Sequence, residues 1–192
     1  YETDVIGAHW IDIIEFSDGS TMTQAELLQA VLDAEATDGS DTLTAFGSPV
    51  TYLGDAPILD GGEGDDLYLN EFREVHVRLS AVGGSDRLVT QTIDAAPAAY
   101  NSTRTYVHLA ADLDPADILV LFERRDGDPV TVFRTKSGAE LAVIDRLYSG
   151  ARSLLYVLAA DGRQFQPIED GGLIEQLTGT QDTDFMVGRF DR

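Results

Sequence analysis

Glycine and aspartate interrupt the chain between Thr37 and Val89 so often that neither a long helix nor a long strand fits there. Apolar residues in this stretch come mostly in short pairs, and a turn containing Gly or Asp separates each pair from the next. The glycines are Gly39, Gly47, Gly54, Gly61, Gly62, Gly64, Gly83 and Gly84. This spacing predicts very short strands joined by tight turns.

One helix is predicted, immediately before this stretch. Thr23 and Glu26 have the spacing of a capping box, and apolar residues at helical spacing follow them up to about Glu35. Upstream, the apolar segment Trp10–Phe16 precedes an Asp18-Gly19 turn. This arrangement predicts a β-hairpin that leads into the helix.

The second half of the chain alternates between apolar segments and turns. Strands are predicted at Thr105–Leu109, Ile118–Glu123, Val130–Arg134, Glu140–Ile144 and Leu154–Leu158, with turns at Asp126-Gly127-Asp128, Ser137-Gly138 and Asp161-Gly162. Asp114 before Pro115 predicts one capped helical turn. The fold class expected from the sequence is therefore all-β, with an antiparallel β-rich region and one short helix.

The composition points to cations as partners. The formal net charge is -21 and the pI about 4.1, with Lys136 as the sole lysine. A fold this acidic repels nucleic acid and anionic membrane surfaces, and its self-repulsion calls for bound divalent ions or high external salt. An acidic surface of the halophile kind is the alternative. Cysteine is absent, and no apolar run has the length of a membrane span or the pattern of a signal peptide.

The nonapeptide Gly61–Leu69 carries the most specific motif in the chain. Its sequence, GGEGDDLYL, fits the pattern G-G-x-G-x-D-x-U-x, with Tyr68 at the large apolar position U. It resembles the repeat of RTX (haemolysin-type calcium-binding) proteins, and the resemblance implies a short parallel β-roll, or solenoid, with calcium as the bound ion. In such a roll the glycines let carbonyl oxygens turn inward and the aspartate supplies a carboxylate. The candidate metal ligands in this turn are Gly62, Gly64 and Asp66.

An ion in such a roll lies between the turns of successive coils, so a partner turn is needed. Val82–Val89 supplies one, with Gly84 and Asp86 as candidate site residues, and Asp41 in the segment Asp38–Leu43 supplies another. Leu53-Gly54-Asp55 is a weaker third. Ligands that are all oxygen suit calcium better than zinc or copper. The alternative left open is that these are ordinary Gly-Asp turns of a β protein.

A second resemblance extends over about two-thirds of the chain. Leu113–Ile118, followed by paired strands, and the segment Phe16–Leu27 resemble the opening and closing motifs of the haemolysin-type calcium-binding-related domain, which accompanies RTX repeats. The closing motif is degenerate in its second occurrence at Ala159–Ile168. Because the chain has one good nonapeptide where the family stacks several, we expect one or two calcium ions.

An internal repeat is indicated by two matches that share one offset. WIDIIEFSDGS and SLLYVLAADGR align Asp18 with Asp161, and TDGSDTLTA and TQDTDFMVG align Asp41 with Asp184, each at an offset of 143 residues. Chance similarity between glycine-rich turns is the alternative. The matches divide the chain as follows: 1–36, the end of a preceding copy; 37–92, an RTX-like β-roll segment; 93–172, the haemolysin-type calcium-binding-related β domain; 173–192, the start of a following copy.

No enzyme motif accompanies these features. The three histidines, His9, His76 and His108, form no HExxH pair, and the chain has neither a G-x-S-x-G elbow nor a cysteine nucleophile. We therefore expect a non-enzymatic, secreted calcium-binding structural module, extracellular or on a bacterial cell surface, in an adhesin or filament whose repeats adjoin or self-associate. The alternative is the non-catalytic calcium-binding and export domain of a secreted enzyme or toxin.

Overall fold

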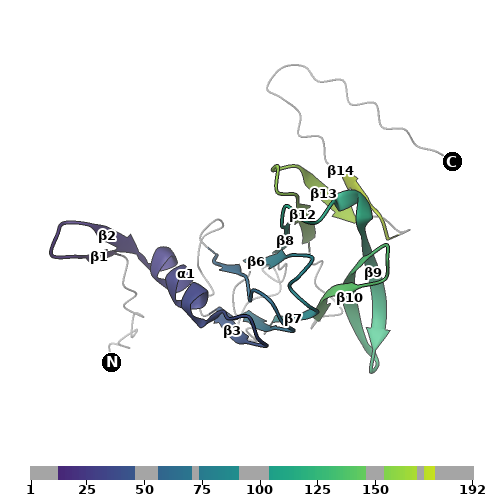
Figure 1. Cartoon of the computed structure of the whole chain (residues 1–192), viewed down its shortest axis with the longest axis horizontal. Helices are drawn as coiled ribbons and strands as arrows, with labels where there is room; N and C mark the ends of the chain where they lie inside the picture. The colour runs from purple at the N-terminus through teal and green to yellow at the C-terminus, as the bar shows by residue number, and fades with distance from the viewer. Residues whose placement is uncertain are drawn as a thin grey trace, which may run out of the picture.

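The computed structural model describes residues 13–45, 56–70, 74–90, 104–145, 154–167 and 171–175 (Figure 1). Its elements are β1 (Ile13–Glu15), β2 (Thr21–Thr23), α1 (Gln24–Glu35), β3 (Thr42–Ala45), β4 (Ile58–Leu59), β5 (Leu67–Asn70), β6 (Glu74–Leu79), β7 (Asp86–Thr90), β8 (Arg104–Leu109), β9 (Ile118–Arg125), β10 (Asp128–Thr135), β11 (Glu140–Asp145), β12 (Leu154–Leu158), β13 (Gln164–Pro167) and β14 (Leu173–Glu175). The expected all-β class with one short helix is confirmed.

Two six-stranded sheets form the body of the described part of the molecule. Sheet 1 has the order β3-β5-β7-β11-β10-β9, and sheet 2 has the order β14-β13-β12-β8-β6-β4. From β3 to β8, successive strands alternate between the sheets, and β11 and β12 continue this alternation after the β9–β10 excursion. Neighbours among the alternating strands pair in parallel, whereas the hairpins at the far ends of both sheets pair antiparallel. The result is a parallel β-roll extended by antiparallel strands, as expected.

The hydrophobic core lies between the two sheets. One register row of sheet 1 consists of Leu43, Tyr68, Leu88 and Ile144, and one row of sheet 2 consists of Leu59, Val77, Val107 and Val157. All eight side chains are buried in a single cluster. Buried and partly exposed residues alternate along β8, as the two-residue period of a strand requires. Burying each large apolar side chain contributes about 1.5–3 kcal/mol, so these rows hold the coils together.

Helix α1 covers the end of the roll formed by β3 and β4. The predicted capping box is present: the backbone N–H of Glu26 donates to the Thr23 hydroxyl, and the Glu26 carboxylate accepts from the Thr23 backbone. Leu32 is buried in the core. The Gln29 amide donates to the carbonyl of Ile58 at 3.0 Å and accepts from its N–H at 2.8 Å. This side chain thus occupies the hydrogen-bonding edge of β4 as a further strand would.

The predicted strands after residue 103 are all present, some of them longer than expected at the ends. The capped turn also forms, as a short 3₁₀ helix Pro115–Asp117 with Asp114 as its N-cap. Strands from the segments 37–92 and 93–172 belong to the same two sheets. The Leu53-Gly54-Asp55 turn and Asp184 lie outside the described residues. The part of the chain that the structure describes contains no helix of the length and apolarity of a membrane span.

Candidate metal centre

Three turns lie one above another on the same side of the roll. Residues 37–41, 60–66 and 80–85 lead into β3, β5 and β7, which are adjacent in sheet 1. Thr37 of the first turn forms a parallel bridge with Gly62 of the second. The backbone N–H of Leu67 donates to the carbonyl of Asp41, and that of Arg87 donates to the carbonyl of Asp66. The stack is therefore a continuation of the sheet hydrogen bonds into the turns.

The backbone requires glycine at each of the three candidate glycine positions. Gly62, Gly64 and Gly84 have φ values of 85°, 110° and 82°, in the left-handed region that favours glycine. A Cβ on Gly64 would lie 2.8 Å from the carbonyl carbon of Gly39, and a Cβ on Gly84 would overlap the carbonyl oxygen of Gly64. These glycines therefore allow one turn to stack closely on the next, and they also allow the bend within each turn.

The three candidate aspartates occupy equivalent positions, one in each turn. The backbone N–H of Asp41 donates to Oδ1 of Asp66 at 2.8 Å, and the backbone N–H of Asp66 donates to Oδ1 of Asp86 at 3.1 Å. Asp66 and Asp86 point into the roll and are 2% and 4% exposed. The carboxylate of Asp41 instead accepts from Thr37 within its own turn. The row ends at the next coil, where Ala142 is opposite Asp86.

Buried negative charge is concentrated at Asp66 and Asp86. Desolvation, opposed in part by hydrogen bonding to Asp41 and reinforced by neighbouring carboxylates, raises the pKa of Asp66. Burial also raises the pKa of Asp86, to about 7, and the nearby charge of Asp66 adds to that rise. Among the described residues, Oδ2 of Asp66 is one of two buried side-chain oxygens without a hydrogen-bond partner, the other being Oδ1 of Asp145. A cation or a proton would compensate this charge.

The structure adds residues that the sequence did not single out. The Tyr68 hydroxyl accepts from the N–H of Gly61 at 3.0 Å and donates to Oδ2 of Asp86 at 3.2 Å. A Cβ on Gly61 would overlap the Asp66 carboxylate, so the first glycine of the motif makes room for its aspartate. Tyr68 was interpreted only as the large apolar residue. The signal was its hydroxyl, because a buried tyrosine oxygen needs a partner.

Backbone carbonyls surround the same turns. The carbonyl oxygens of Thr37, Gly39, Gly62 and Gly64 each lie close to a glycine of the next turn, namely Gly62, Gly64, Gly83 and Gly84. No group of three or more His, Cys, Asp or Glu side chains in the described ranges is placed to hold a metal. An ion at this stack would therefore be bound by one or two carboxylates together with carbonyl oxygens, which is a donor set that calcium accepts.

A second group of titratable side chains lies on the outer face of sheet 2. His76 is hydrogen-bonded to His108 at 2.8 Å and to Glu74 at 3.1 Å, and it stacks on Tyr106. Burial lowers the pKa of His108 to about 4, and the nearby His76 and Arg78 contribute to the decrease. The two imidazole nitrogens are hydrogen-bonded to each other, so in this arrangement they do not converge on a common ion.

Comparisons with protein-family models, with curated proteins and with solved structures found no match to this chain.

Proposed function

We propose that this chain is a secreted, calcium-binding structural module of a larger RTX-like protein, whose stacked turns bind calcium and whose roll is stabilised by it. The single observation that carries the proposal is Oδ2 of Asp66. It is a carboxylate oxygen that is buried in the turn stack without a hydrogen-bond partner, and the Asp86 carboxylate is hydrogen-bonded to the backbone of the same residue.

A bound cation would compensate the buried charge in the turn stack. Two carboxylates that are 2% and 4% exposed are expensive to bury unless a proton or a cation compensates them. In the same turns, carbonyl oxygens of one turn lie close to glycines of the next, and calcium combines carboxylate and carbonyl ligands. Because the turns form one stack only in the folded roll, binding of the ion and folding are coupled.

This coupling gives the module its expected role. Extracellular calcium modules have dissociation constants on the order of 10⁻⁴ to 10⁻³ M, so a chain of this kind stays loosely folded at cytosolic calcium and folds after export. The net charge of -21 strengthens the effect, since self-repulsion opposes compaction until cations are bound. Outside the cell the folded roll serves as a rigid structural unit of an adhesin or filament.

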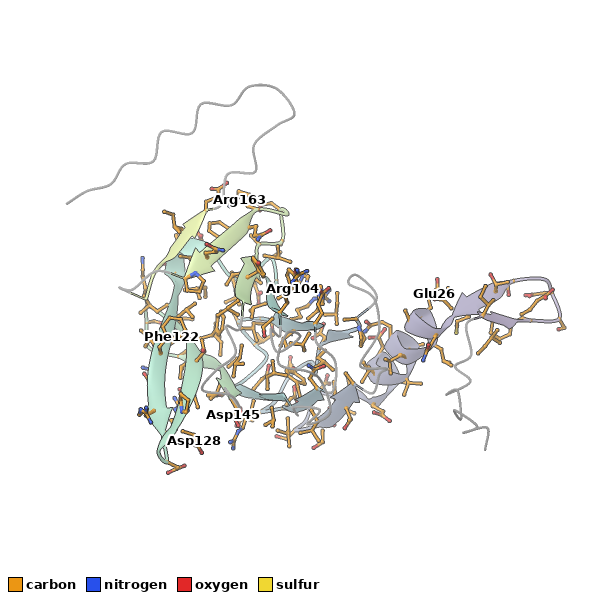
Figure 2. All side chains as sticks on the ribbon, turned by 180° about the vertical axis from the view of Figure 1, so that it is seen from behind. Glu26, Arg104, Phe122, Asp128, Asp145 and Arg163 are labelled. Carbon is orange, nitrogen blue, oxygen red and sulfur yellow. The ribbon has the colours of Figure 1, made fainter. Side chains whose placement is uncertain are left out.

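The proposal is tested by titrating calcium into the metal-free chain in a calorimeter. The test variant is Asp66→Asn, which keeps an acceptor for the Asp41 N–H and removes the charge. The matched control is Asp145→Asn, which removes the charge of the other carboxylate that has a buried, unpartnered oxygen; Asp145 lies at the end of β11 (Figure 2), outside the three turns.

We expect the native chain and Asp145→Asn to bind calcium alike and Asp66→Asn to bind roughly tenfold more weakly or worse, because calcium affinity follows the number of charged ligands. Calcium at about a hundred times Kd should stabilise the native chain by about 2.7 kcal/mol. A native chain that binds no calcium, or an Asp66→Asn variant that binds as well as the native chain, would contradict the proposal. It would show that the carboxylates of Asp66 and Asp86 serve only as hydrogen-bond acceptors for the backbone N–H groups of the turns.

A further inference from the structure

The β1–β2 hairpin projects from the molecule beyond α1, away from the two large sheets (Figures 1 and 2). It forms a separate two-stranded sheet, in which Ile14 pairs with Met22 and Glu15 with Thr21. Ile13 and Phe16 are 61% and 45% exposed. An isolated two-stranded hairpin is marginally stable in water, and among the described residues no further strand pairs with β1–β2.

The same hairpin occurs again in the body of the molecule as β12–β13. At an offset of 143 residues, the pair Ile14 and Met22 corresponds to Val157 and Phe165, which also pair with each other. The agreement extends one register position further, because Glu15–Thr21 corresponds to the pair Leu158–Gln164.

The two turns agree as well, bond for bond. Gly19 and Gly162 have φ values of 84° and 85°. In each hairpin the N–H of this glycine donates to the carbonyl of the residue three positions earlier at 2.9 Å. The carbonyl of the residue after the glycine accepts from the N–H of that same earlier residue, which closes the turn. The N–H of the residue after the glycine donates to the carboxylate of the turn aspartate. The residues are Phe16, Asp18 and Ser20 in one turn and Ala159, Asp161 and Arg163 in the other. The repeat suggested by the sequence is thus reproduced in the backbone of both hairpins.

The surroundings of the two hairpins differ. β12 pairs in parallel with β8 along its whole length, and Val157 and Phe165 are 0% and 7% exposed in the core between the sheets. Their counterparts Ile14 and Met22 are only half-buried. Tyr156 stacks on Tyr106 of β8 at 5.0 Å, whereas its counterpart Ile13 is exposed. Among the described residues, the β1–β2 hairpin therefore has the backbone pairing of the β12–β13 hairpin without a neighbouring strand of the β8 type.

We propose that β1–β2 is the closing hairpin of another copy of this repeat unit, with β1 added in parallel to the β8-type strand of that copy. The β12–β13 precedent fixes the register: Ile14 and Met22 enter the core of the receiving roll, and Ile13 lies beside its Tyr106. Glu15 then lies next to His108, where its negative charge stabilises the protonated form of the imidazole. Helix α1 joins the docked hairpin to the next roll, so rolls follow one another in an array.

The docking surface is made of backbone hydrogen bonds and apolar side chains, and it does not involve the turns proposed to bind calcium. Calcium binding can therefore be absent while the hairpin docks, and the hairpin can fail to dock while calcium binds. Calcium binding is measured by titration of the single chain, and docking is measured by protection of the hairpin in a chain that contains two rolls.

The experiment compares the single chain with a two-copy chain in which residues 1–153 are followed directly by residues 11–192, which preserves the 143-residue period. Hydrogen exchange is followed at the amides of the β1–β2 hairpin, in calcium. In the two-copy chain we expect exchange at the junction hairpin to be roughly 100-fold slower than in the single chain, because a docked strand exchanges only when it opens.

The control is Ile14→Asp. In the single chain, where Ile14 is half-buried at the projecting hairpin, the substitution should leave hydrogen exchange in the two large sheets unchanged. At the junction of the two-copy chain, the same substitution should abolish the added protection of the hairpin. It should also speed up exchange in the β8 strand of the first roll, because that strand loses its neighbour. Exchange at the junction hairpin that is as fast as in the single chain would overturn the proposal, as would a first roll that does not fold with β1–β2 as its closing hairpin.

Discussion

Replacing Gly84 by alanine tests whether the turns are stacked as closely as the structure has them. Gly84 has a φ of 82°, and a Cβ there would overlap the carbonyl oxygen of Gly64 and lie 2.6 Å from its carbonyl carbon and 2.9 Å from Oδ1 of Asp65. Gly162 is the matched control, because its φ is 85° and a Cβ on it would meet nothing within 4 Å.

Both substitutions place alanine in the left-handed region, which costs roughly 1–2 kcal/mol. Gly84→Ala must in addition separate two backbone turns that cannot move independently of β5 and β7, and overpacking of this kind costs about 1–3 kcal/mol more. The expected loss in the free energy of unfolding is therefore about 2–5 kcal/mol for Gly84→Ala and about 1–2 kcal/mol for Gly162→Ala.

Equilibrium urea denaturation, followed by circular dichroism at one saturating calcium concentration for both variants, measures the two losses in the folded, calcium-bound chain. A small domain has only about 5–15 kcal/mol of stability, so the difference between the variants is readily measured. Equal losses for the two variants would refute the close stacking of the turns, and with it the arrangement of the candidate metal centre.

Three further substitutions test other parts of the structure. Gln29→Ala should destabilise the chain by about 1–2 kcal/mol in urea denaturation because it uncovers the edge of β4, whereas Asp33→Ala, which leaves both bonds to the strand intact, should not. Tyr68→Phe should cost about 1–3 kcal/mol because the buried N–H that bonds to the hydroxyl loses its partner; an unchanged midpoint would count against that bond. Arg125 and its neighbours hold the pKa of Glu140 down to about 2, so Glu140 stabilises the fold fully above its unfolded pKa near 4.5. The stability difference between the native chain and Glu140→Gln should therefore be constant from neutral pH to about 5 and shrink as pH falls toward 2, and a difference that grew on acidification would contradict this account.

Local signals in the sequence were sufficient to predict most elements. The Thr23–Glu26 capping box and the Asp114-Pro115 turn satisfy backbone groups within a few residues, so each can be recognised from its own segment. The same is true of the strands and of the Asp18-Gly19 hairpin. Their ends were less accurate: β10 begins at Asp128, two residues before the predicted start at Val130, because pairing with β9 continues to the turn.

The pairing of strands from distant segments could not be predicted from local motifs. The sequence divided the chain at residue 92, yet β8 pairs with β6 on one side and with β12 on the other, and the β9–β10 hairpin is inserted between β8 and β11. Parallel pairing depends on side chains from separate coils packing in one core, and no local motif encodes that choice. The bonds from Gln29 to β4 were missed for this reason.

The structure brings the turns with the candidate residues together, and their contacts were not predicted from the sequence. Gly62, Gly64 and Gly84 were singled out by motif, and the stack explains them by steric necessity. The sequence placed Asp66 with a partner turn on either side, and both flanking turns do adjoin it. The link through backbone N–H groups and the hydroxyl of Tyr68 depends on the exact stagger of the coils, which the spacing of the aspartates does not determine.

The most direct test of the central claim is a crystal structure of the chain grown in millimolar calcium. We predict an ion at the three stacked turns, with Oδ2 of Asp66 and carbonyl oxygens of the glycine turns at about 2.3–2.6 Å from it. An ion bound only elsewhere, or a turn stack in which Oδ2 of Asp66 contacts water or a protein donor at that calcium concentration, would contradict this prediction.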